Sequence, residues 1–105
     1  MTKTIRYQVV LAVVVSLASA VGFAQSPGEA TYKAKCATCH GAAGTPSAGM
    51  AKAMGIKPAS DPEIKKLTAE QMFTVVKAGK GKMKAVTGLT DAQIKESVAY
   101  FKSLK

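Results

Sequence analysis

The residues best suited to chemistry form the segment Cys36-Ala37-Thr38-Cys39-His40. Two cysteines three positions apart lie on one face of a helix end, so both thiols can add to the two vinyl groups on one edge of a porphyrin. The adjoining imidazole can then reach the iron from one side. This C-x-x-C-H pattern is typical of c-type haem attachment. It predicts one covalent haem c held by the two cysteines, with His40 as an iron ligand.

Two other chemistries use closely spaced cysteines. A thioredoxin-like dithiol shares the C-x-x-C spacing but accompanies a βαβ pattern, and this sequence shows no strand pattern. A structural zinc site needs four protein ligands, whereas Cys36, Cys39 and His40 supply three, and the chain has no other cysteine or histidine. Haem attachment is therefore the interpretation that the rest of the chain supports.

The second iron ligand must differ from the first, because the chain has a single histidine. A methionine sulfur is the next choice, and four of the five methionines follow the start residue. Met72 lies in an apolar helix pattern, where we expect it to fill the core. Met50 and Met54 are four residues apart and can share one helical face, so they are reserve candidates.

Met83 is the preferred second ligand. It ends the loop Gly79-Lys80-Gly81-Lys82-Met83, whose glycines allow the backbone to approach a flat cofactor. A lone apolar side chain among lysines has no evident packing role, and iron ligation would give it one. Ligation by one histidine and one methionine raises the reduction potential of the haem relative to two nitrogen ligands. It also leaves no open position for a substrate at the iron, which favours electron transfer over catalysis.

The first residues have the pattern of an export signal. Lys3 and Arg6 give a positive start, an apolar run follows, and small residues end it. Cleavage sites fit after Ala20 or Ala24, and the second is preferred because a polar stretch begins there. The sequence thus predicts a cleaved signal peptide from Met1 to Ala24 and an exported, periplasmic protein. If the segment were retained, it would anchor the protein to a membrane.

The mature chain, residues 25–105, has about 80 residues and room for one domain. A core of that size stabilises little by itself, so the apolar surface of a cofactor would complete it. The net charge of the full sequence is +9, with basic residues dispersed along it, which favours acidic partners. Nucleic acid is excluded as a partner because no recognition motif is present. We expect a monomer without membrane contact after cleavage.

Helix start and stop signals predict an all-α fold of about three main helices and short helical turns, wrapped around the haem. Ser26, Thr68 and Thr90 each precede a glutamate or glutamine by three residues, the pattern of a capping box. The main helices are expected over residues 27–39, 69–78 and 91–104. Shorter pieces are expected around residues 50–54, inside an irregular loop over residues 41–61, and over residues 62–67.

The sequence resembles the class I c-type cytochromes, specifically the short bacterial monohaem kind, over nearly all of the mature chain. Gly28 and Tyr32 resemble a glycine and aromatic pair that packs against an aromatic residue of the last helix, here Tyr100. Residues 79–83 resemble the loop of that family that carries the distal methionine, and residues 89–94 resemble the start of its terminal helix. The resemblance implies haem c at the cysteines and Met83 as the distal ligand.

Three features depart from the pattern of that family. Lys84 follows Met83 where a proline is frequent, which implies a less rigid loop and an iron–sulfur bond that is easier to displace. Pro46 and Pro58 are both imperfectly placed to offer a carbonyl to the proximal histidine. Ser97 replaces a larger apolar residue in the last helix, which implies a looser helix contact.

The resulting functional prediction is a soluble one-electron carrier, not an enzyme, that docks transiently with acidic redox partner proteins. Five lysines are expected around one exposed haem edge: Lys35, Lys52, Lys80, Lys82 and Lys84. The alternative is a haem enzyme or gas-binding sensor in which the distal position is open or Met83 is only loosely bound.

Overall fold

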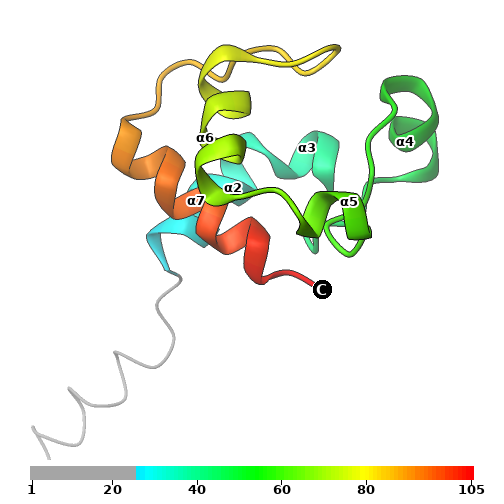
Figure 1. Cartoon of the computed structure of the whole chain (residues 1–105), viewed down its shortest axis with the longest axis horizontal. Coiled ribbons are helices and arrows are strands. Elements are labelled where there is room, and N and C mark those ends of the chain that lie inside the picture. The colour runs from blue at the N-terminus through cyan, green and yellow to red at the C-terminus, as the bar shows by residue number, and fades with distance from the viewer. Residues whose placement is uncertain (1–25) are drawn as a thin grey trace, which may run out of the picture.

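The computed structural model describes residues 26–105 and shows an all-α chain (Figure 1). The expected export signal lies outside the described residues. Within them the β-type pairing is confined to an isolated bridge between Lys80 and Met83, and no helix is long and apolar enough to cross a membrane. The helices are α2 (Pro27–Lys35), α3 (Ala37–His40), α4 (Ala48–Met54), α5 (Pro62–Lys65), α6 (Ala69–Ala78) and α7 (Asp91–Ser103).

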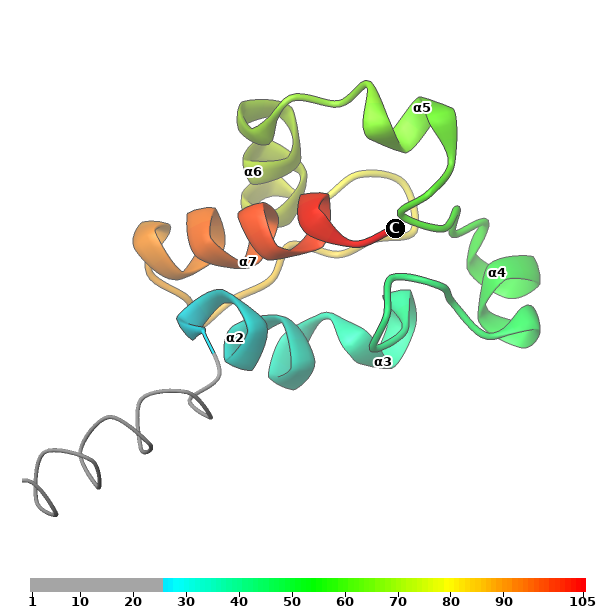
Figure 2. The same ribbon diagram turned by 90° about the horizontal axis from the view of Figure 1, so that it is seen from below.

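The prediction of three main helices and several short helical turns is confirmed. Helices α2, α6 and α7 have 9, 10 and 13 residues, and the other three have 4 to 7. In both views α2 and α7 lie side by side, α6 packs against α7, and α4 stands at the far end from this group (Figures 1 and 2).

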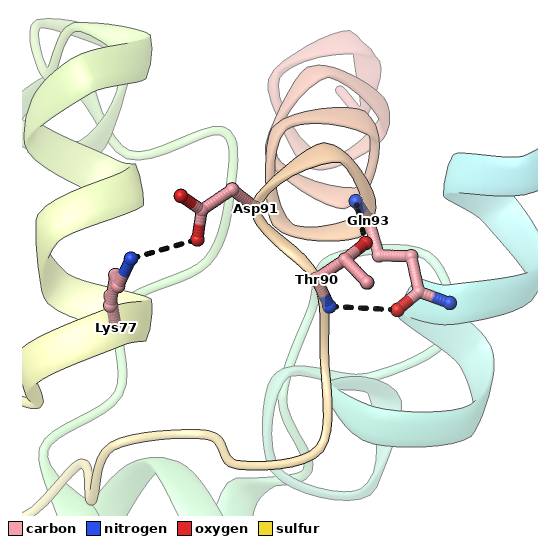
Figure 3. Close-up of polar contacts among 4 residues, drawn as sticks. All are labelled: Lys77, Thr90, Asp91 and Gln93. Atoms are coloured by element: carbon pink, nitrogen blue, oxygen red, sulfur yellow. Dashed lines mark hydrogen bonds and ion pairs between the residues drawn. The ribbon is translucent and has the colours of Figure 1, made fainter.

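Side-chain caps explain where the two longest helices begin. Thr68 and Thr90 each accept a hydrogen bond from the backbone N–H three residues later, and Gln71 and Gln93 accept one from the backbone N–H of the cap. Each box satisfies donors that a helix start leaves without a partner. Figure 3 shows the box at α7, beside an exposed ion pair in which Lys77 and Asp91 lie 2.8 Å apart.

The capping box expected at Ser26 is only half present. Its side chain accepts a hydrogen bond from the backbone N–H of Glu29 at 3.2 Å. The Glu29 carboxylate instead pairs with Lys33, one turn further along, at 2.9 Å. The basic neighbour four residues on therefore competes successfully for this carboxylate, and the prediction of a complete box was wrong.

The first helix ends earlier than the sequence suggested. It was expected to run to Cys39, but α2 ends at Lys35 and Cys36 adopts φ −114° and ψ −35° between α2 and α3. The backbone N–H of Cys39 bonds to the carbonyl of Cys36 at 3.2 Å, the tighter spacing of a 3₁₀ turn. Gly41, with φ 82°, then ends α3. Cys36 thus lies at the junction of two helices and Cys39 lies on α3, so the cysteines are not on one continuous helix.

The contact between α2 and α7 is close because Gly28 lacks a side chain. A β-carbon at this position would lie 2.7 Å from the carbonyl carbon of Glu96 and 3.4 Å from the backbone nitrogen of Ser97. Ser97 is buried, and its hydroxyl donates to the carbonyl of Ile94 at 2.9 Å. The looser contact expected from Ser97 is therefore wrong, because the small side chain satisfies its own polar group and lets the backbones approach.

The aromatic cluster predicted at this crossing is confirmed. Tyr32 is 1% exposed, and its ring centroid lies 5.3 Å from that of Tyr100 and 5.9 Å from that of Phe101. Its hydroxyl donates to the carbonyl of Gly41 at 2.6 Å. Tyr32 therefore connects α2, α7 and the residue that follows His40.

The hydrophobic core between α6 and α7 is small. Met72, Ile94 and Val98 are its buried members, so the core role predicted for Met72 is confirmed. Half-buried apolar residues surround them: Ile64, Leu67, Phe73, Val76, Leu89 and Phe101. So small a core leaves much apolar surface facing a large cavity beside it.

Candidate functional site

A cavity of about 1050 Å³ lies between the helices and the segment that joins α6 to α7. Ligand pockets commonly enclose about 300 to 1,000 Å³, so the cavity has room for a large planar group. Most of its lining is apolar: Met54, Ile56, Ile64, Leu67, Met72, Val75, Val76, Val86, Val98 and Phe101 belong to it. The cavity thus offers the apolar site that the short chain was expected to need.

Cys36, Cys39 and His40 all line this cavity. Both cysteines are half-buried free thiols. Burial raises the pKa of the Cys36 thiol, which therefore stays protonated at neutral pH. The structure thus presents two thiols and one imidazole to the same apolar cavity.

The His40 ring is held neutral. Burial lowers its pKa, because the charged form would lose its hydration. Neutral imidazole is the form that binds metals. Phe101 packs against the ring edge at a centroid distance of 5.6 Å.

One nitrogen of His40 has no protein partner. Nδ1 is buried and makes no hydrogen bond with any of residues 26–105. Neither Pro46 nor Pro58 offers its carbonyl to this nitrogen, so the acceptor that the family resemblance implied is not formed here. The aromatic contact, and not a carbonyl, therefore limits how the ring can turn.

Met83 reaches the same cavity from the segment between α6 and α7. The backbone of Lys80 and Met83 exchanges two hydrogen bonds, of 2.9 and 3.0 Å, and so forms a tight turn with Gly81 and Lys82 at its tip. Gly81 has φ 58°, which suits the first central position of a type II′ turn. We call residues 79–84 the methionine turn.

The base of the methionine turn depends on Gly79. This residue has φ 79°, and a β-carbon here would lie 2.8 Å from the backbone nitrogen of Ala85 and 2.9 Å from the carbonyl oxygen of Met83. The N–H of Val86 then bonds to the carbonyl of Val76 at 2.8 Å. The chain therefore leaves α6 and returns to it within a few residues, with Met83 at the cavity between.

Comparisons with known proteins agree with this geometry. The family model described as cytochrome c oxidase, cbb3-type, subunit III matches residues 23–101. Cytochrome c-555 of Chlorobaculum tepidum is 39% identical over 94 residues, which cover 78% of this chain and 78% of that protein. This chain belongs to the c-type cytochromes.

Solved structures of a c-type cytochrome share the fold of this cytochrome. The KustC0563 c-type cytochrome has a TM-score of 0.66 at 26% identity, covering 74% of this chain and 96% of its own. A tyrosine-to-phenylalanine mutant of that protein has a TM-score of 0.65 at 24% identity, covering 76% and 100%, and shows the fold alone. The resemblance to a small class I monohaem cytochrome is confirmed.

The cytochrome therefore carries haem c, bound covalently, and its single C-x-x-C-H segment accounts for one haem. The structure fits this group. The cavity is large and mostly apolar, two free thiols stand at its wall, and the imidazole beside them is neutral. As a cytochrome c, the chain is a haem c electron carrier.

The other methionines of the cytochrome differ in their position relative to the cavity. Met54 lines the cavity from the end of α4, and Met72 lines it from the core. Met50 is half-buried on the same short helix and is not part of the described cavity lining. Of the two reserve candidates for the second iron ligand, only Met54 belongs to the described cavity lining. Met72 is 7% exposed and belongs to the core.

Four of the five lysines expected around the haem edge line the cavity: Lys35, Lys80, Lys82 and Lys84. Lys52 is exposed on α4 and does not belong to the described lining.

A further lysine, Lys57, lines the cavity and pairs with Glu63. The reason lies at Gly55, which ends α4 with φ 67° and turns the chain back, so that residues 56 and 57 face the cavity. Gly55 stands directly after the expected short helix, and this helix-stop signal could have indicated the return.

Proposed function

We propose that this cytochrome is an exported, soluble one-electron carrier in which His40 and Met83 are the two axial ligands of the haem iron. The observation that carries the proposal is the placement of Met83, which lines the same cavity as Cys36, Cys39 and His40. When bound, haem c supplies an iron that gives or takes one electron by changing between its ferrous and ferric states.

The two cysteines would keep the cofactor in place. Thioether bonds from Cys36 and Cys39 prevent loss of the haem in a dilute exterior. The apolar lining excludes water and adds the buried surface that the small core lacks. The chain's own contribution is thus to attach the haem and to keep it dry.

His40 and Met83 would fill both open sides of the iron. His40 is neutral, so its lone pair is available for the metal. A thioether opposite a histidine raises the reduction potential relative to two nitrogen ligands. With both sides occupied, there is no free position for a substrate, which is why the proposal is a carrier and not an oxidase or gas sensor.

The face around the cavity suits acidic partner proteins. Five lysines line the cavity, and Glu63, paired with Lys57, is its single acidic residue among the described residues. Such a surface speeds encounter with a negatively charged partner, and dissolved salt screens the attraction over about 8 to 10 Å. The rate constant of electron exchange with an acidic redox protein should therefore fall as ionic strength rises. A rate independent of salt would remove this part of the proposal.

Export would place the carrier in the periplasm after residues 1–24 are removed. The mass of the mature protein tests this directly, because it reports both the cleavage site and the added haem. A mass that retains the first 24 residues would indicate a membrane-anchored form instead.

Absorption spectra of the oxidised and reduced protein test the ligation. A low-spin haem with a thioether ligand supports the carrier, whereas a high-spin haem that readily binds carbon monoxide supports an enzyme or sensor with an open distal position. Met83→Ala should convert the first type of spectrum into the second. Met50→Ala is the matched control, because its side chain lies on α4 outside the described cavity lining, and it should change nothing. An unchanged spectrum in Met83→Ala would assign the ligand to Met54.

A further inference from the structure

Lys82 makes a contact that distinguishes it from the other lysines of the methionine turn. Its Nζ donates a hydrogen bond to the carbonyl oxygen of Ala53 at 2.9 Å, across 29 positions of sequence. Ala53 lies in the last turn of α4, whose final carbonyls lack partners within the helix. A positively charged group at a helix C-terminus is also favoured by the helix dipole.

This hydrogen bond joins two segments that otherwise have few connections. Helix α4 stands apart from α2, α6 and α7 in both views, and the tip of the yellow segment that holds the methionine turn reaches toward it (Figures 1 and 2). Within residues 26–105, the Lys82–Ala53 bond is the hydrogen bond that connects α4 with the turn. The tip of the turn is therefore fixed at α4 and its base at α6.

Met83 is the next residue after this anchor. Its backbone belongs to the turn through both hydrogen bonds with Lys80, so a displacement of the tip moves Met83 with it. Lys80 and Lys84 also line the cavity, but their side chains make no hydrogen bond or ion pair with another described residue. All three lysines of the methionine turn line the cavity. Among them, Lys82 alone is bonded to α4.

We propose that Lys82 is a positioning residue for Met83: its bond to Ala53 holds the tip of the methionine turn against α4 and thereby keeps the methionine sulfur at the haem. This rests on the proposed ligation by Met83. Loss of the ammonium group should free the tip and increase the fraction of molecules in which Met83 is detached. Because one hydrogen bond of a charged donor is lost at an exposed place, the population of the detached form should rise about fivefold.

Imidazole binding to the ferric holoprotein measures this population, because imidazole occupies the position that a detached methionine leaves. In Lys82→Leu, which adds no sulfur beside Met83, the apparent dissociation constant for imidazole should fall about fivefold, as the competent fraction rises. Lys82→Arg keeps a charged donor and should stay near the native value. Lys80→Leu and Lys84→Leu remove the same charge from the same turn without removing a bond, and they should also stay near it.

The outcomes distinguish the inference from the proposal on which it rests. If the native protein lacks thioether ligation, the assignment of Met83 is wrong. If the native spectrum shows that ligation but all three lysine-to-leucine variants bind imidazole alike, the bond from Lys82 does not position Met83 and the inference is wrong. Should Lys82→Leu not yield holoprotein, Lys82→Ala, which has neither the charge nor a side-chain donor, is measured in the same way, and a native value for it would equally overturn the inference.

Discussion

The two sides of the haem cavity are built by different means. On the histidine side, α2 and α7 cross without space for a side chain at Gly28, and Tyr32 lies among the aromatic rings of α7. On the methionine side, a short helix and a six-residue turn meet through one lysine at Ala53. The first side is held by close packing and the second by a few hydrogen bonds and by glycine conformations.

This difference matters for an electron carrier. The attachment side must never release the cofactor, and close packing around the helix crossing resists movement because it has no alternative arrangement of similar energy. The methionine side has few buried apolar contacts and several exposed hydrogen bonds, which are the features of a region that opens locally. We therefore expect changes on the first side to affect folding of the whole chain, and changes on the second to affect ligation at the iron.

Gly28→Ala should have the largest effect, because it acts on the histidine side. The new β-carbon would meet the backbone of Glu96, which cannot turn away as a flexible side chain could. Separating α2 from α7 should cost about 3 kcal/mol of unfolding free energy, or prevent maturation. Denaturant unfolding of the holoprotein measures this.

Gly49→Ala is the control for that change. Gly49 also lies in a helix, but a β-carbon there would have no atom within 4 Å. It should be neutral or stabilise by about 0.5 kcal/mol. Equal stability of the two variants would contradict the claim that close packing at the crossing carries the fold.

Gly79→Ala should have a smaller effect on folding and a larger one on ligation. The substitution costs about 2 kcal/mol, from the left-handed backbone and from contact with Ala85. Because an exposed turn can shift to relieve the contact, the haem should stay attached while the low-spin spectrum is partly lost. Gly88→Ala is matched in φ, which is 80°, but has open space around the added carbon. It should cost about 1 kcal/mol and leave the spectrum unchanged; similar spectra for both would argue against a positional role for the turn.

Local signals in the sequence predicted much of this architecture. The complete capping boxes at Thr68 and Thr90 are where the pattern placed them, since each depends on residues three apart. The Gly28 and Tyr32 pair was also predicted, through the family resemblance, and its packing against Tyr100 is confirmed. The cofactor followed from five consecutive residues and is confirmed by the family to which the chain belongs.

The features that the sequence could not show depend on competing side-chain partners or on contacts between residues far apart in the chain. Glu29 had two partners within reach, and its choice of Lys33 over the cap depends on small differences in side-chain geometry. The place of Lys57 at the cavity depends on the turn at Gly55, and the bond from Lys82 to Ala53 depends on how two loops meet in space. No spacing rule relates residues 29 positions apart, so the anchor of the methionine turn could be found only in the structure.

Tyr32→Phe should have the smallest effect at neutral pH and a distinct one in alkali. The hydroxyl donates to the carbonyl of Gly41, and removing it should lower the unfolding free energy by about 1 kcal/mol at pH 8. Burial raises the pKa of Tyr32 from 10.0 to about 12. The folded protein thus keeps this proton over a range in which the unfolded chain has lost it.

The sign of the pH effect follows from this difference. Below pH 10 Tyr32 is protonated in both the folded and the unfolded protein, so it adds no pH dependence. Between about pH 10 and 12 only the unfolded state releases the proton, so the native protein loses stability as pH rises. Tyr32→Phe should remove that part of the slope, so that its stability equals the native value at about pH 11 and exceeds it toward pH 12. Tyr100→Phe removes a hydroxyl that bonds to no other described residue and makes only the smallest contribution to the raised pKa of Tyr32, so it should keep most of the native slope. Denaturant unfolding at pH 8 and pH 11.5 compares the three proteins. If the unfolding free energy fell equally with pH in all three, the Tyr32 hydroxyl would be more exposed to water than its packing indicates.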